Sequence, residues 1–148
     1  MNIAEKNLKA FLLMIRYAEG TSSENGYQKL YGGSVFNDLS KHPNIAVTKW
    51  GITSTAAGAY QILFKTWTEI QQKLKLPDFS PQSQDKAAVA LIKRRKALDD
   101  VLAGRFAQAL LKCRKEWASL PGAGYNQSEK SPIALAKVYK IAGGSIAA

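Results

Sequence analysis

Glu19 stands where an apolar residue would be expected on the first predicted helix. Leu8, Phe11, Leu12 and Ile15 recur at helical spacing, and Glu19 continues the same stripe. Burial and the negative end of the helix dipole would both raise the pKa of this carboxyl, and no basic residue is adjacent in sequence. A carboxyl that stays protonated near neutral pH can act as a general acid. Two other interpretations stay open: a structural acceptor for backbone N–H groups, or a helix rotated so that Glu19 is exposed.

Two loops have compositions that core packing does not require. Residues 54–61 (STAAGAYQ) and 122–127 (GAGYNQ) each combine small residues with a Tyr and an amide. Small residues let a backbone approach a ligand closely, while the aromatic ring and the amide supply a stacking face and hydrogen bonds. Such surfaces suit sugars, so these loops predict a saccharide site.

Glycoside cleavage often uses two carboxylates, and the acids nearest to Glu19 in the following polar region are Glu24 and Asp38. Neither has a context typical of catalysis. Asp38 follows Phe36-Asn37, where an Asp is expected to cap a turn.

The elements that must position these residues are mostly helical. The first predicted helix begins at an Asn2-x-x-Glu5 capping box and stops near Gly20. Further helices are predicted over residues 63–74, 81–98, 105–117 and 132–142. Residues 21–61 are rich in Gly, Ser, Thr and Asn, and the apolar pieces 35–36 and 45–48 predict brief antiparallel strands. We therefore expect one α+β domain over residues 1–148, mostly helical with a small antiparallel β insertion. Its active-site cleft would lie beside that insertion, with Glu19 at the base.

Composition excludes several classes of protein. The chain has 148 residues and 46% hydrophobic content, which fits a folded domain of ordinary size. The single Cys113 cannot form an internal disulfide, and His42 has no second His or Cys nearby, so no metal site is expected. The N-terminal apolar run is short and interrupted by Lys9 and Arg16, so we expect no signal peptide and synthesis in the cytoplasm.

The net charge of +10 is unevenly distributed. Residues 86–148 contain 12 Lys and Arg against 4 Asp and Glu, whereas residues 1–85 contain 9 against 7. A basic half attracts polyanions such as an anionic lipid or an acidic cell-wall polymer. The densest run, residues 93–96, lacks interleaved aromatic residues and any nucleic-acid-binding motif around it, so nucleic acid is not the expected partner.

Several segments together resemble one family. They are residues 19–21 (EGT), Gly32-Gly33 with Phe36, His42-Pro43, residues 54–61, residues 78–85 (DFSPQSQD) and residues 117–125 (WASLPGAGY). In this order they resemble the lambda-type phage endolysins over nearly the whole chain. The resemblance implies a lysozyme-like α+β fold and lytic transglycosylase activity. Such enzymes cleave the β-1,4 bond between N-acetylmuramic acid and N-acetylglucosamine and leave a 1,6-anhydro end.

The resemblance also implies roles for individual residues. Glu19 matches the catalytic acid/base. The residues that match positions expected to line the saccharide cleft are Ser54, Gly58, Tyr60, Gln61, Tyr125 and Gln127.

A missing acid separates two possible reactions. The muramidase-type phage lysozymes place an Asp nine residues after the helix Glu and a Thr six residues later. Here those positions hold Gln28 and Ser34. A hydrolase of that type needs the second acid, whereas an enzyme that uses the C6 hydroxyl of its own substrate needs only one. The pattern therefore favours transglycosylation.

Sequence and resemblance together predict a monomeric phage or prophage endolysin that acts on peptidoglycan glycan strands without metal or organic cofactor. Its basic half would hold it at anionic cell-envelope polymers or lipopolysaccharide. It would wait in the host cytoplasm until another phage protein permeabilises the inner membrane, and then act on the periplasmic wall. Two alternatives remain: a water-using muramidase, and a non-catalytic module that binds saccharide or nucleic acid.

Overall fold

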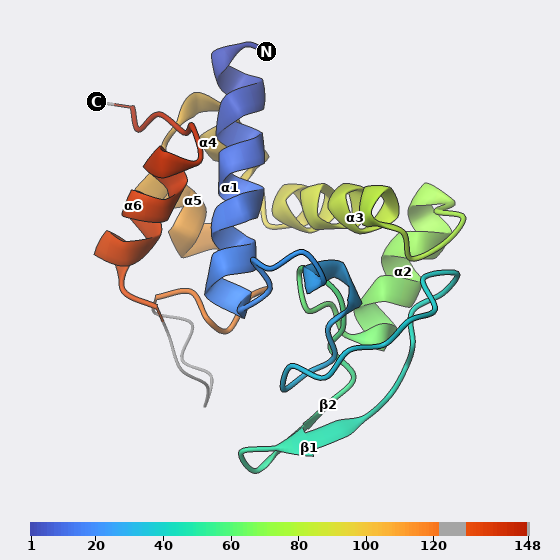
Figure 1. Cartoon of the computed structure of the whole chain (residues 1–148). Helices are drawn as coiled ribbons and strands as arrows, with labels where there is room; N and C mark the ends of the chain where they lie inside the picture. Colours follow the sequence, from blue (N-terminus) through green and yellow to red (C-terminus); the bar gives the residue numbers. More distant parts are fainter. Residues whose placement is uncertain (122–129, 148) are drawn as a thin grey trace. The chain divides into compact units, whose positions relative to one another are not determined.

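The computed structural model describes residues 1–121 and 130–147, and they group into two compact units. Unit 1 comprises Met1–Glu19 and Val89–Ala148, and unit 2 comprises Gly20–Ala88 (Figure 1). The division falls within one helix, α3 (Pro81–Arg94), which belongs partly to each unit. Among the described residues, no helix is long and apolar enough to cross a membrane.

The regular elements of unit 1 are all helices in the part of the chain that the structure describes. Its elements are α1 (Ile3–Glu19), the end of α3, α4 (Leu98–Ala103), α5 (Phe106–Cys113) and α6 (Pro132–Ile141). Helix α1 packs against α4 and α6, as Figure 1 shows. The Phe106 ring lies between two aromatic neighbours, with its centroid 6.1 Å from Phe11 and 4.6 Å from Tyr139. These rings join α1, α5 and α6 through one apolar core.

Helix α1 begins and ends as its sequence predicts. The Glu5 backbone N donates to Asn2 Oδ1 at 2.8 Å, and the Asn2 backbone N donates to Glu5 Oε2 at 3.3 Å, which completes the capping box. The helix stops before Gly20, which has a φ of +76°. Its buried face comprises Asn7, Ala10, Phe11, Met14, Ile15 and Ala18. Glu19 is partly exposed at the edge of this face, so the helix is rotated slightly from the predicted stripe.

Unit 2 contains the small sheet. Strands β1 (Val47–Lys49) and β2 (Ile52–Ser54) pair antiparallel, with Val47 opposite Ser54. The two-residue turn between them holds Trp50 and Gly51, both at positive φ, as a tight hairpin requires. A 3-10 helix, η1 (Gly26–Gln28), precedes the hairpin, and α2 (Phe64–Leu74) follows it.

The core of unit 2 is aromatic. Phe79 is fully buried, and its ring centroid lies 4.6 Å from Trp67 and 4.9 Å from His42. The His42 imidazole is satisfied in its neutral form, because Nε2 lies 2.8 Å from the Ile62 carbonyl and Nδ1 accepts from the Asn44 backbone N at 3.0 Å.

The expected fold class, mostly helical with a small antiparallel insertion, is confirmed. Three local expectations were wrong. Residues 35–36 form no strand, because Val35 makes only an isolated bridge to Lys29. The helix predicted over 81–98 ends at Arg94 and a separate α4 follows, because the chain turns at Lys96 with a φ of +59°. The helix predicted over 105–117 ends at Cys113.

Candidate active site

Glu19 lies at the last position of α1, where Ser119 donates a hydrogen bond to its Oε2. Ser119 is 6% exposed and stands between Trp117 and Leu120, which are 1% and 0% exposed. The Ser119 carbonyl accepts from the Lys130 backbone N at 2.8 Å. The Ser119 hydroxyl is therefore positioned by a turn whose flanking residues are buried in the core.

The environment of Glu19 perturbs its pKa strongly. Burial raises the pKa from 4.5 to about 7, and the Ser119 hydrogen bond and the positive charge of Lys130 oppose that rise. The carboxyl is therefore divided between its acid and its anion at neutral pH. Such a group can donate a proton in one step and accept one in the next. This agrees with the raised pKa that the sequence predicted for Glu19.

Residues 54–61 form a tightly bonded loop of unit 2. Thr21, the last residue of the Glu19-Gly20-Thr21 motif, is buried and donates from Oγ1 to the Ala59 carbonyl at 2.5 Å. Ser54 Oγ accepts from the Ala56 backbone N at 3.0 Å. These bonds fix the backbone of the loop.

Gly58 is required by packing. It has a φ of +83°, and a Cβ there would overlap Gln84 Oε1 and lie 2.9 Å from Phe79 Cζ. The same Gln84 side chain accepts from the Ala59 backbone N at 2.9 Å and donates to the Phe79 carbonyl at 2.8 Å. The Gln84 side chain thus fixes the backbone of residues 58–59 by packing and hydrogen bonding.

Tyr60 and Gln61 also have structural contacts. Tyr60 is 2% exposed, and its hydroxyl donates to Asp85 Oδ1 at 2.6 Å; the Tyr27 hydroxyl donates to the same oxygen at 2.8 Å. Gln61 Nε2 donates to the Lys29 carbonyl at 3.1 Å and to the Gly58 carbonyl at 2.9 Å. The buried ring of Tyr60 presents little stacking surface, contrary to the reasoning from composition. Saccharide binding by Ser54, Gly58, Tyr60 and Gln61 stays a prediction.

Two further predicted binding residues, Tyr125 and Gln127, lie outside the described residues. Of the two acids weighed as partners of Glu19, Asp38 caps a turn as expected, accepting from the Ser40 backbone N at 2.9 Å. Glu24 is exposed. Within residues 1–121 and 130–147, no cluster of His, Cys, Asp and Glu could hold a metal ion.

Comparison with known proteins places the chain in a family. The Endolysin family model matches residues 9–146. The chain is 43% identical to the endolysin of Escherichia phage P2, over 94% of this chain and 94% of that protein. It is also 43% identical to the endolysin of Escherichia phage lambda, over 93% and 92% of the two chains.

Two solved structures resemble the chain as a whole. Bacteriophage lambda lysozyme complexed with a chitohexasaccharide matches with a TM-score of 0.92 at 42% identity, covering 99% of this chain and 98% of that one. A second structure, lysozyme from bacteriophage lambda, has a TM-score of 0.88 at 40% identity and the same coverage. The chain belongs to the Endolysin family, and the lysozyme-like fold implied by the sequence motifs is confirmed.

Reasoning from the sequence missed Ser119 and Lys130 as neighbours of Glu19. Ser119 lies a hundred residues away along the chain, within the segment WASLPGAGY. That segment carries the Tyr that composition singles out, and Ser119 is an ordinary residue within it. A small hydroxyl residue between the apolar Trp117 and Leu120 was the available clue.

Proposed function

We propose that the chain is a peptidoglycan-degrading enzyme that works as a lytic transglycosylase. It would cleave the β-1,4 bond between N-acetylmuramic acid and N-acetylglucosamine and leave a 1,6-anhydromuramyl end. The observation that carries the proposal is the environment of Glu19, where burial against the Ser119 hydrogen bond and Lys130 sets a pKa of about 7. One group with this pKa can serve as both acid and base.

In the proposed reaction Glu19 first donates its proton to the bridging oxygen, and the bond from that oxygen to muramyl C1 breaks. The N-acetylglucosamine side leaves as an alcohol. The C6 hydroxyl of the same muramyl residue then forms a bond to C1, and its proton passes to the Glu19 carboxylate. The carboxyl returns to its starting state, and no water is consumed.

The residues at the positions of a second acid support this reaction over hydrolysis. Gln28 ends η1, and its backbone carbonyl accepts from the Phe36 backbone N at 2.8 Å. Ser34 is exposed, and its carbonyl accepts from the Leu30 backbone N at 2.7 Å. Neither side chain carries the negative charge that would activate water or stabilise a cation.

Glycan strands of peptidoglycan are the proposed substrate. The relative with a bound chitohexasaccharide supports a saccharide ligand. We retain Ser54, Gly58, Tyr60, Gln61, Tyr125 and Gln127 as proposed binding residues, and residues 1–148 as one catalytic domain. The proposed place of action is the periplasmic cell wall, after another phage protein has permeabilised the inner membrane.

The test is product analysis of purified peptidoglycan by mass spectrometry. Transglycosylation yields muramyl ends that are one water lighter than the reducing ends of hydrolysis. Glu19→Gln should abolish both kinds of product, and Glu24→Gln, which removes an exposed carboxylate, should keep wild-type activity. Reducing ends would establish a muramidase instead, and full activity in Glu19→Gln would remove Glu19 from the mechanism. Absence of any cleavage would favour a binding module.

A further inference from the structure

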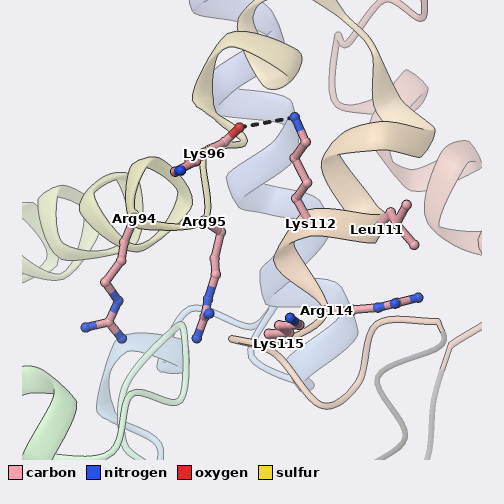
Figure 2. Close-up of a pocket in the computed structure, with 7 residues that line it drawn as sticks. All are labelled: Arg94, Arg95, Lys96, Leu111, Lys112, Arg114 and Lys115. Atoms are coloured by element: carbon pink, nitrogen blue, oxygen red, sulfur yellow. Dashed lines mark hydrogen bonds between the residues drawn. The ribbon is translucent and has the colours of Figure 1, made fainter.

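A pocket of about 340 Å³ in unit 1 is lined almost entirely by cations. The lining residues are Arg94, Arg95, Lys96, Leu111, Lys112, Arg114 and Lys115. They come from the end of α3 and the turn after it, and from α5 and the turn after it, as Figure 2 shows. Neither the proposed reaction nor the environment of Glu19 uses any of these residues.

Two nearly buried carboxylates hold Arg94, Arg95 and Lys112 in place. Glu116 Oε1 accepts from Arg94 Nη2 at 3.0 Å and from Arg95 Nε at 2.9 Å, and the Glu116 side chain is 8% exposed. Asp100, whose side chain is 7% exposed, pairs with Lys112 Nζ at 2.6 Å and also with Arg105 outside the pocket.

Lys112 also links the two sides of the pocket. Its Nζ donates to the Lys96 carbonyl at 3.3 Å, which is the dashed contact in Figure 2. The side chains of Arg94, Arg95 and Lys112 therefore have defined positions before any ligand arrives, which lowers the entropic penalty of binding.

The charge of the pocket exceeds what these carboxylates can neutralise. Six cations line it, and in the part of the chain that the structure describes Glu116 pairs with Arg94 and Arg95, while Asp100 is shared between Lys112 and Arg105. Guanidinium and ammonium groups bind phosphate oxygens strongly, Arg in bidentate fashion. A phosphomonoester carries nearly two negative charges, whereas a carboxylate carries one, so clustered phosphates match this charge density best.

We propose that this pocket binds a compact anion bearing two or more phosphate groups, either free or as the headgroup of a membrane lipid. The site would hold the enzyme at a phosphate-rich surface or polymer without involving Glu19.

Substitution of Lys96 can remove one cation of the pocket without disturbing the fold. Lys96 occupies the left-handed position after α3, with a φ of +59°, where glycine is unstrained. Lys96→Gly removes one cation, keeps the carbonyl that Lys112 contacts, and relieves backbone strain, so it should not unfold the protein. Lys75→Gly is the matched control, because Lys75 is an exposed lysine at φ +55° after α2, in unit 2. Arg114→Gln is a second single variant that removes a different cation, and the double variant with Lys96→Gly removes both.

The first experiment is calorimetric titration of the full chain with inorganic tripolyphosphate, with citrate as a carboxylate comparison. We expect saturable binding to tripolyphosphate and much weaker binding to citrate. Each single pocket variant should weaken the affinity about three- to fivefold, and the double variant about tenfold or more. Lys75→Gly should bind as the wild type. Equal affinities in the pocket variants and in Lys75→Gly, or citrate binding as tight as tripolyphosphate, would overturn the proposal.

The second experiment distinguishes the sources of phosphate. Phosphatidylcholine vesicles with and without phosphatidic acid are sedimented with the protein, and tripolyphosphate is added as competitor. Sedimentation that requires phosphatidic acid, is weakened by Lys96→Gly and is reversed by tripolyphosphate assigns the pocket to a lipid headgroup. Tripolyphosphate binding through the pocket, without sedimentation sensitive to Lys96→Gly, assigns it to a free phosphate polymer. Failure of tripolyphosphate to bind at all rejects both.

Discussion

Replacing Glu19 with Gln should stabilise the folded protein at neutral and alkaline pH. Burial raises the pKa of Glu19 from 4.5 to about 7, so the folded protein keeps a proton that the unfolded chain releases between these values. The favourable contribution is therefore complete below pH 4.5 and is lost as the pH rises toward 7. At about 1.4 kcal/mol for each pKa unit, the loss amounts to about 3 kcal/mol. Glu19 is partly exposed, and solvent screening reduces the expected gain in Glu19→Gln to about 2 kcal/mol.

The assay is urea unfolding of wild type and Glu19→Gln at about pH 4 and at about pH 8, followed by tryptophan fluorescence and circular dichroism. The free energies of unfolding should agree within about 0.5 kcal/mol at the lower pH and differ by about 2 kcal/mol at the higher pH. Glu24→Gln controls for the loss of one negative charge from a strongly basic chain and should behave as wild type. A Glu19→Gln protein that is no more stable than wild type at pH 8 would refute the reasoning.

Three further predictions concern other groups. Ser119→Ala should raise the pKa of Glu19 by about one unit, since a hydrogen bond to a charged group contributes about 1.5 kcal/mol; the basic limb of the kcat/KM profile should move to higher pH, and Ser119→Thr should restore it. Superimposable profiles for Ser119→Ala and wild type would reject this. Burial lowers the pKa of His42, so its contribution to stability is present above pH 6.5 and is lost as the pH falls from 6.5 through the lower pKa of the folded protein. His42→Gln should then lose less stability than wild type between about pH 7 and 5, measured by urea unfolding, and equal losses would contradict it. Burial raises the pKa of Cys113 to about 12, so its thiol should react with a disulfide reagent far more slowly in the folded protein than in urea, and equal rates would count against this.

The start of α1 shows what local sequence can predict. The capping box of Asn2 and Glu5 and the stop at Gly20 are local signals, because each depends on hydrogen bonds or dihedral angles within a few residues. The N-cap at Ser131 is of the same kind, with its Oγ accepting from the Ala134 backbone N at 3.1 Å. Such boundaries were predicted correctly because no distant residue decides them.

The break after α3 shows what local sequence hides. Residues 92–98 contain neither Gly nor Pro, and Lys96 is an ordinary helix former, so nothing local signals a turn. The turn is closed by the Ala97 backbone N donating to the Ile92 carbonyl at 3.1 Å and by Lys112 reaching the Lys96 carbonyl. The second contact comes from another helix, and only the folded chain brings it there.

The residues of the candidate site also differ in whether a local signal or a distant contact marks them. Glu19 could be found from sequence because a carboxyl on an apolar helical stripe is anomalous by itself. Ser119 could not, because its importance lies in one contact with a residue a hundred positions earlier. Tyr60 was assigned as a stacking face from composition, and its hydrogen bond to the half-buried Asp85 cannot be seen in the linear pattern.

The pKa of Glu19 depends on two opposed effects, burial on one side and the contacts with Ser119 and Lys130 on the other, so these neighbours matter as much as the carboxyl itself. Burial without Ser119 and Lys130 would raise the pKa above 7 and favour an acid that cannot easily take a proton back. A stronger set of donors would hold the carboxyl as an anion that cannot donate in the first step. A single group that must act in both directions works best when neither form dominates, and opposed contributions near neutral pH meet that requirement. In the proposed reaction, Ser119 is therefore a positioning residue that keeps the Glu19 carboxyl able both to donate and to accept a proton.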